Sequence, residues 1–206
     1  MNSYNTEFVV FDVETTGLSP LNGDRIIEVA AVKIKAGKIV DEYTSLINPQ
    51  RDIPIEAQRV NKITPEMIAD APFSESVLPG IISFIAGACL VGHNIKFDLD
   101  FLCFELSALG RKLKNETPAL DTLKMSKHLM AHLRSHRLSY LATSLGLSVA
   151  ETHRALADVK LTIAVFYRLL DIASDQGLEE IQDLIKLFSV QKPNFPIKIV
   201  NHELFF

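Results

Sequence analysis

A short apolar run, Phe8–Phe11, limits the possible folds of this chain more than any other feature. It lacks helical spacing, and such a run is typical of a central strand that is covered on both faces. Two β-branched-rich segments, Arg25–Ile34 and Ile39–Ile47, flank residues 35–38 and predict an antiparallel hairpin. The chain is therefore expected to start with a sheet whose middle strand is buried.

Strands and helices alternate in the rest of the chain. The pattern predicts strands at Cys89–Gly92 and Ala119–Leu123, and helices at Ser74–Ala86 and from Asp98 onward. Three more helices are indicated by apolar stripes: Leu138/Leu141/Leu145 with Gly146 as a C-terminal cap, Val159/Ile163/Phe166/Leu170, and Leu178/Ile181/Ile185/Phe188. This alternation predicts one α/β domain with a mixed sheet over residues 1–190, followed by a C-terminal tail at 191–206.

Length and composition exclude several classes of protein. The chain has 206 residues, near the upper edge of one domain, and its 48% hydrophobic and 22% charged residues exclude disorder, collagen and coiled coils. The net charge of −4 argues against a nucleic-acid coat protein, but it is compatible with an enzyme that contacts nucleic acid briefly.

Several features predict a cytoplasmic protein with no membrane partner. Residues Met1–Glu7 are polar and lack the basic start of a secretory signal. The stretch Leu78–Val91 is interrupted by proline and glycine and is shorter than the roughly 20 residues of a membrane span, so a buried helix and strand explain it better. Cys89 and Cys103 lie in apolar runs without Cys-x-x-Cys spacing, which predicts buried free thiols in a reducing compartment.

Asp12 and Glu14 follow the first strand two residues apart, so their side chains point to the same face of the sheet. Neighbouring carboxylates on a buried strand repel each other unless a cation or a proton neutralises them. The alternative is a strand end that frays into solvent, where acidic residues are common. The pair alone leaves a metal site and an exposed strand end equally open.

Two further acids and a histidine favour the metal site. Asp98 falls on the first turn of a helix after a buried strand, where an acid is commonly only a cap. Asp158 lies near the start of the helix that carries Val159, and His153 precedes it on the loop, where a histidine is commonly only solvated. Four acids at strand and helix ends beside one histidine indicate a site for a hard divalent cation with a titratable neighbour.

Three motifs in register make the chain similar to a known family. They are Asp-x-Glu-Thr-Thr-Gly at 12–17, His-Asn-x-x-Phe-Asp at 93–98 and His-x-Ala-x-x-Asp at 153–158. In this order they resemble the DEDDh group of 3′–5′ exonucleases and, within it, the proofreading epsilon subunits of bacterial DNA polymerase III. The resemblance covers about residues 6–175 and implies a ribonuclease-H-like fold, a five-stranded mixed sheet with helices on both faces. Asn61-Lys62 stands where the family shows His-Gly.

This resemblance implies a metal-dependent exonuclease that hydrolyses phosphodiester bonds at single-stranded or frayed DNA 3′ ends and releases nucleoside monophosphates. Its cofactors are expected to be two divalent cations, Mg²⁺ or Mn²⁺, that hold the attacking water and the leaving 3′ oxygen. Asp12, Glu14 and Asp158 are expected to hold one ion. Asp12 and Asp98 are expected to serve the second ion, and His153 is expected to take the proton from the water.

Two alternatives remain beside this function. An RNA 3′-end trimming exoribonuclease of the same superfamily is one, because nothing in the sequence visibly recognises a 2′-hydroxyl. A non-catalytic nucleic-acid-binding module is the other, and it would have lost a carboxylate or the histidine, whereas all five residues are present.

The resemblance also implies a set of substrate-binding residues. They are Thr15, Thr16 and Gly17 through their backbone groups, Leu18 as a wedge between the last two bases, and Asn94 and Phe97. For Thr16 and Leu18, an ordinary turn and ordinary packing are equally suitable explanations.

Basic residues concentrate at 111–137, where seven of them stand against two acids, a local charge of +5. They are Arg111, Lys112, Lys114, Lys124, Lys127, Arg134 and Arg137. Such a strip just before His153 is suited to a phosphate backbone, although a solvated helix face has the same composition.

The last residues, 201–206, place Leu204 and Phe205 after Asn201 and resemble the short motif by which bacterial replication proteins bind the sliding clamp. A replicative polymerase or a sliding clamp is therefore a candidate partner beside the DNA 3′ end. The alternative is a terminal apolar plug that packs on the domain's own surface. The tail is also shorter than the one that epsilon subunits carry.

Overall fold

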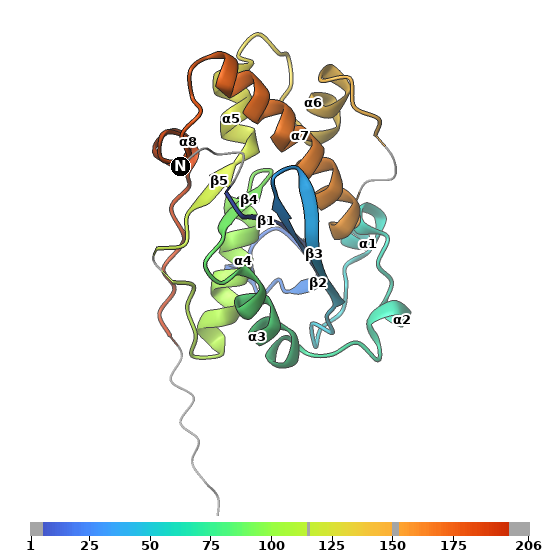
Figure 1. Ribbon diagram of the computed structural model, residues 1–206. Coiled ribbons are helices and arrows are strands. Elements are labelled where there is room, and N and C mark those ends of the chain that lie inside the picture. The colour runs from blue at the N-terminus through green and yellow to red at the C-terminus, as the bar shows by residue number, and fades with distance from the viewer. Residues whose placement is uncertain (1–5, 115, 150–152, 198–206) are drawn as a thin grey trace, which may run out of the picture.

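The computed structural model describes residues 6–114, 116–149 and 153–197 and contains a five-stranded sheet in the order β3-β2-β1-β4-β5 (Figure 1). The strands are β1 (Phe8–Thr15), β2 (Ile26–Lys35), β3 (Lys38–Leu46), β4 (Cys89–Gly92) and β5 (Ala119–Asp121). β1 lies in the middle, antiparallel to β2 and parallel to β4. The expected hairpin, buried strand and mixed sheet are confirmed.

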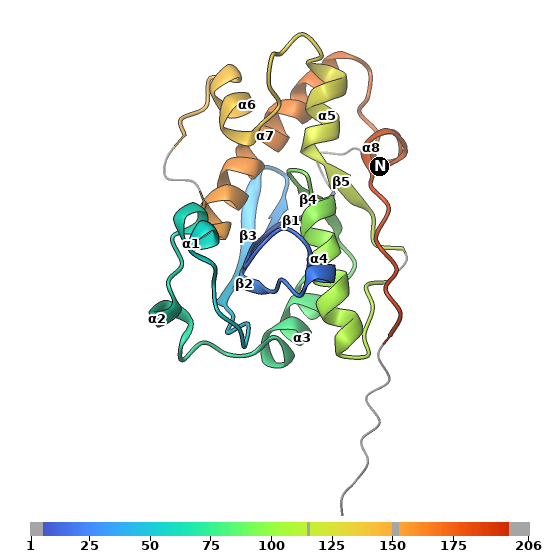
Figure 2. The same cartoon turned by 180° about the vertical axis from the view of Figure 1, so that it is seen from behind.

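Helices cover both faces of the sheet, as the two views show (Figure 1, Figure 2). One face packs against α3 (Ser74–Ile85) and α4 (Lys96–Ala108). The other packs against α7 (Ala155–Asp175), with α5 (Thr122–Leu129), α6 (Leu138–Ser144) and α8 (Ile181–Phe188) around it. The connections contain α1 (Ile55–Asn61), α2 (Pro65–Ile68) and a 3₁₀ turn at Pro20–Asn22. The expected five-stranded mixed sheet with helices on both faces is thus confirmed.

The alternation of side chains along β1 decides where its acidic residues point. Phe8 and Val10 belong to the core beneath α7, whereas Val9, Phe11 and Val13 belong to the core that packs against α3 and α4. Since side chains on one face recur every second residue, Asp12 and Glu14 continue the face of Phe8 and Val10. Phe8 meets Phe166 of α7 edge to face, with ring centroids 4.9 Å apart, which fixes α7 over this face.

Several element boundaries differ from the sequence predictions. β1 extends beyond the predicted strand Phe8–Phe11, because its pairing with β2 continues to Thr15. The expected strand over Ala119–Leu123 is too long, because the Asp121 carboxylate accepts the Leu123 N–H at 2.9 Å and caps α5. The predicted helix from Leu178 begins only at Ile181, after the left-handed Gly177 (φ 81°). The short helices α1 and α2 were not predicted.

Two apolar segments and the two cysteines fold as the sequence predicts. The stretch Leu78–Val91 forms the buried face of α3 followed by β4, as predicted. Cys89 and Cys103 are buried free thiols, also as predicted, and burial raises the pKa of each to about 12. No helix in the described ranges combines the length and the apolar character that crossing a membrane requires.

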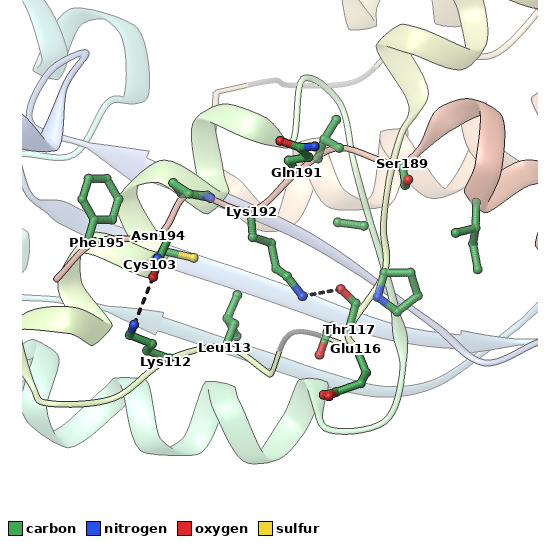
Figure 3. Close-up of a pocket in the computed structure, with 15 residues that line it drawn as sticks. Cys103, Lys112, Leu113, Glu116, Thr117, Ser189, Gln191, Lys192, Asn194 and Phe195 are labelled. Carbon is green, nitrogen blue, oxygen red and sulfur yellow. Dashed lines mark hydrogen bonds between the residues drawn. The ribbon is translucent and has the colours of Figure 1, made fainter. Parts of the chain in front are cut away.

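Residues 189–195 run along β5 and close a pocket of about 700 Å³ against the connection between α4 and β5 (Figure 3). The Lys192 ammonium donates across this pocket to the carbonyl oxygens of Lys114 and Thr117, each at 2.6 Å. The described residues that line the pocket include none of the predicted metal ligands. The predicted domain boundary at residue 190 stays a prediction, and the predicted tail contact at 201–206 lies outside the described residues.

Candidate active site

Three carboxylates meet on the α7-facing side of β1. Asp12 and Glu14 extend from the strand, and Asp158 extends from the first turn of α7. One carboxylate oxygen from each residue lies within 4.8 Å of those of the other two. Carboxylate oxygens gathered this closely suit a hard divalent cation. The structure therefore brings these three predicted ligands together.

Asp98, the fourth predicted acid, lies on the first turn of α4 and has only 3% of its surface exposed. Its Oδ1 accepts the Val13 N–H at 2.9 Å, beyond the point where the pairing of β1 with β4 ends at Val10 and Val91. Burial, followed by the charge of Asp98, raises the pKa of Asp12. Asp98 thus stands beside the three-carboxylate cluster and is anchored to the backbone of the strand that carries it.

The carboxyl groups of the cluster hold protons more tightly than free acids do. Burial raises the pKa of Asp12 well above its ordinary range, and the charges of its acidic neighbours add to this effect. Burial and the charges of Asp158 and Glu28 raise the pKa of Glu14 from 4.5 to about 8. Burial also raises the pKa of Asp158. A cation that displaces these protons relieves the repulsion, which is the behaviour of a metal-ligand set.

The raised pKa of Glu14 predicts how the stability of the metal-free protein depends on pH. A carboxyl group with a higher pKa in the folded state stabilises the fold while protonated, and this contribution is lost as the pH rises from 4.5 through about 8. The amide in Glu14→Gln does not titrate. We therefore expect its unfolding free energy, relative to wild type, to increase by about 2 kcal/mol between about pH 5 and pH 9. Urea unfolding in a chelator measures this difference, and a difference independent of pH would contradict the prediction.

His153 lies on the loop that leads into α7, as predicted, and its side chain is exposed. Its backbone is left-handed, with φ 69°, a conformation that a histidine keeps only where its surroundings hold it. The backbone N–H of His153 donates to Asp158 Oδ2 at 2.8 Å. The same carboxylate therefore belongs to the cluster and fixes the loop. The charge of the His153 side chain also acts on Asp158, opposing the rise in its pKa, which places the imidazole near this acid.

A partly buried ion pair, absent from the sequence predictions, holds the same loop. The Arg154 guanidinium donates to the Glu28 carboxylate of β2 at 2.7 Å, and the Ala155 N–H donates to the same carboxylate at 3.0 Å. Because Glu28 pairs with Glu14 across the two strands, this contact joins the start of α7 to the sheet beside the cluster. The sequence signal is an acid inside the apolar run of β2, a position that a charge occupies only with a partner.

The predicted substrate-binding residues after β1 form a tight turn. Thr15 and Thr16 are buried, and the Thr15 hydroxyl donates to the Gly17 carbonyl at 2.6 Å. Gly17 packs so closely on the Asp24 carboxylate that a Cβ at this position would clash. Leu18 follows with 86% of its surface exposed, so its side chain is available for contact. Contacts between this turn and a substrate stay a prediction.

The other two predicted substrate-binding residues differ in exposure. Asn94 is exposed and left-handed, with φ 61°, and its N–H donates to the Asp121 carboxylate at 2.9 Å. Phe97 is partly buried against the core under α4, with its ring centroid 5.0 Å from that of Phe101. Phe97 thus packs on the core, and Asn94 is held at the surface by the buried Asp121, which the predicted site did not include; substrate contacts of both residues stay predictions.

Asn61, where the family shows histidine, is buried and bonds within the fold. Its Nδ2 donates to the Thr15 carbonyl at 3.3 Å, and its Oδ1 accepts the Ile63 N–H at 3.0 Å. The Asn61 side chain therefore ties the end of β1 to the backbone at Ile63.

Comparison with known proteins agrees with this geometry. A family model described as exonuclease, of the RNase T type, matches residues 9–166. The PolC-type DNA polymerase III of Caldanaerobacter subterraneus is 40% identical over 182 residues, which cover 88% of this chain and 13% of that protein. The DNA polymerase III subunit epsilon-like protein of Rhodobacter capsulatus is 40% identical over 175 residues, which cover 83% of this chain and 25% of that protein.

One solved structure matches over nearly its own full length. Exonuclease X in complex with 5′-overhanging duplex DNA has a TM-score of 0.69 and 26% identity, and the match covers 87% of this chain and 98% of that chain. The predicted resemblance is thereby confirmed, and the non-catalytic alternative is not supported, since the acidic cluster is intact. Because the family match spans most of the chain and contains the motifs that supply the clustered carboxylates, this chain belongs to the exonuclease family as a 3′–5′ exonuclease domain of the DEDD type.

Proposed function

We propose that this chain hydrolyses the last phosphodiester bond at the 3′ end of single-stranded or frayed DNA and releases nucleoside monophosphates. The observation that carries the proposal is the cluster of Asp12, Glu14 and Asp158, with Asp98 buried beside it. The relatives support DNA as the substrate. Two are DNA polymerase III proteins by name, and exonuclease X is described in complex with a DNA duplex.

The residues of the cluster fit divalent cations. Hard cations prefer carboxylate oxygens, and the partly buried acids of this site repel one another when they are ionised without a cation. We assign one ion, Mg²⁺ or Mn²⁺, to Asp12, Glu14 and Asp158, and a second to Asp12 and Asp98. When bound, such ions stabilise the negative charge that develops on the attacking and leaving oxygens.

The chain's own residues supply the remaining steps. The exposed His153 imidazole is proposed to accept a proton from the attacking water, since neutral imidazole is a competent base near neutral pH. Arg154 holds this loop on Glu28, so it acts as a positioning residue for His153. The backbone at 15–17 and the exposed Leu18 are proposed to hold the terminal nucleotide.

A replicative polymerase or a sliding clamp is the proposed protein partner, in the cytoplasm. Both replication relatives carry DNA polymerase III in their names, and this chain spans only 13% and 25% of their lengths. An exonuclease beside a polymerase would remove mismatched 3′ ends, which is proofreading. Within this proposal, residues 1–190 form the exonuclease domain and 191–206 form the tail.

Matched single-stranded DNA and RNA oligonucleotides of one sequence test the substrate class. We expect kcat/KM to be higher for DNA by about tenfold, which is within the roughly hundredfold by which a pocket can reject an added hydroxyl. The measurement is the initial rate of mononucleotide release in Mg²⁺ and in Mn²⁺. Equal rates, or faster release from RNA, would favour the RNA 3′-end trimming alternative instead.

A further inference from the structure

A second pocket, of about 560 Å³, lies between the residues that follow β4 and the connection between α5 and α6. Three cationic side chains line it, from Lys127, Arg134 and Arg137, together with Asn94 and His93. None of the described residues that line it is acidic; the buried Asp121 behind Asn94 and Leu123 accepts their backbone N–H groups. We refer to it as the basic pocket.

Partly buried hydrogen bonds hold the wall of the basic pocket in place. His136 Nδ1 pairs with the Ser126 hydroxyl of α5 at 3.1 Å. His93 Nδ1 pairs with the Thr122 hydroxyl at 2.9 Å, and His93 also bonds to the backbone of His136. Burial lowers the pKa of His93 to about 4, so this imidazole is neutral near pH 7. The positive charge of the pocket therefore comes from its lysine and arginines.

The three cations of the basic pocket are available to a ligand. All three are exposed, and none forms an ion pair with another residue in the part of the chain that the structure describes. Guanidinium groups bind phosphate oxygens through two parallel hydrogen bonds.

Other cations of the predicted basic strip point elsewhere. The Lys112 ammonium donates to Asn194 at 3.0 Å and that of Lys124 donates to the Ser189 carbonyl at 2.8 Å, so both contact the C-terminal segment. The strip predicted from the sequence is thus divided by the fold: Lys127, Arg134 and Arg137 line the basic pocket, whereas Lys112 and Lys124 contact the C-terminal segment.

The basic pocket adjoins the carboxylate cluster through the chain itself. β4 runs parallel to β1, with Val91 opposite Val10, so the residues after Gly92 leave the sheet at the edge where Asp12 lies. Asn94 belongs both to this connection and to the pocket lining. A nucleic-acid strand that leaves the cluster on this side meets the three cations next.

We propose that the basic pocket binds internal phosphates of the substrate strand, on the 5′ side of the scissile bond. This inference rests on the proposed function and adds to it a preference for strands long enough to reach the pocket. A terminal 5′ phosphate has the same chemistry, so the experiment has to separate the two sources.

The test compares two triple variants that remove the same charge. The pocket variant is Lys127→Gln/Arg134→Gln/Arg137→Gln, and the control is Lys35→Gln/Lys38→Gln/Lys186→Gln, at exposed positions outside the pocket. Each is assayed on a 5′-hydroxyl DNA oligonucleotide, on its 5′-phosphorylated form and on the p-nitrophenyl ester of thymidine 5′-monophosphate, which is too small to reach the pocket. The ratio of kcat/KM for the oligonucleotide to that for the ester isolates the contribution of the pocket.

For the pocket variant we expect this ratio to fall about tenfold at moderate salt, with or without the 5′ phosphate. The slope of log affinity against log salt should become shallower by about 2, since each phosphate that is no longer neutralised reduces the slope by roughly 0.7. The control variant should keep the wild-type ratio and slope. An unchanged ratio and slope in the pocket variant would overturn the proposal, and so would an effect confined to 5′-phosphorylated strands.

Binding without turnover separates this proposal from the proposed function. Fluorescence anisotropy with the same labelled oligonucleotide in a chelator measures strand binding without turnover, and the difference between the two variants isolates the contribution of the pocket. If wild type hydrolyses neither DNA nor the ester, the proposed function fails, whereas weaker and less salt-dependent binding by the pocket variant would still support the pocket. Hydrolysis with identical binding by both variants would refute the pocket and leave the function standing.

Discussion

Replacing Asp12 with alanine is expected to lower the exonuclease rate by about 10⁴-fold or more, because it removes several kcal/mol of transition-state stabilisation at about 1.4 kcal/mol per factor of ten. Asp12 lies within reach of Glu14 and Asp158, and its electrostatic coupling to Asp98 is the strongest among its acidic neighbours. Its carboxylate serves both proposed cation positions, so no other single change affects both. The measurement is mononucleotide release from a labelled DNA strand at saturating Mg²⁺ or Mn²⁺.

The same position should become more stable once its charge is gone. Asp12→Asn keeps the volume of the side chain and removes the repulsion within the cluster, so we expect the thermal midpoint of the metal-free protein to rise by about 2–6 °C near pH 8. This variant should be folded and inactive, which distinguishes loss of a ligand from loss of the fold. Activity within tenfold of wild type in either variant would contradict the role of Asp12.

Replacing His153 with alanine is expected to reduce kcat by roughly 10²–10⁴-fold, the range for losing a general base. Cation binding should persist, because all four carboxylates remain and because the bond from residue 153 to Asp158 uses the backbone N–H. His153→Gln should be similarly slow, since its amide can hydrogen-bond a water but cannot accept its proton. Isothermal titration with Mn²⁺ provides the control for cation binding.

The pH profile identifies what His153 does. Only neutral imidazole accepts a proton, so the wild-type log rate at saturating cation should rise with pH and then level. This rise should be absent or displaced in His153→Ala. A variant within a few-fold of wild type at neutral pH, with the same profile, would mean that the histidine only positions the water.

The parts of the site that depend on local geometry could be predicted from the sequence. The common face of Asp12 and Glu14 follows from the two-residue period of a strand, and the helix-start positions of Asp98 and Asp158 follow from the elements around them. Asp158 can reach Asp12 only if α7 packs on the face of β1 to which Asp12 points. Only the family resemblance implied this packing. The structure confirms this juxtaposition.

The parts that depend on distant partners could not be predicted. Glu28 and Arg154 are 126 residues apart, and no local pattern pairs them. Asp121 ends β5 instead of extending it because its carboxylate bonds to the backbone of both Leu123 and Asn94. The basic strip was predicted as one surface, and the fold divides it because Lys124 faces the C-terminal segment, away from the basic pocket.

The central claim is that the carboxylate cluster makes this chain a cation-dependent enzyme that shortens DNA from the 3′ end. The most direct measurement is a time course on a single-stranded oligodeoxynucleotide labelled at its 5′ end, with Mg²⁺, after chelation, and after Mg²⁺ is restored. We expect a ladder that shortens one nucleotide at a time from the 3′ end, stops in the chelator and resumes on restoration. Internal cuts, early release of the labelled 5′ nucleotide, or shortening that continues unchanged in the chelator would contradict the claim.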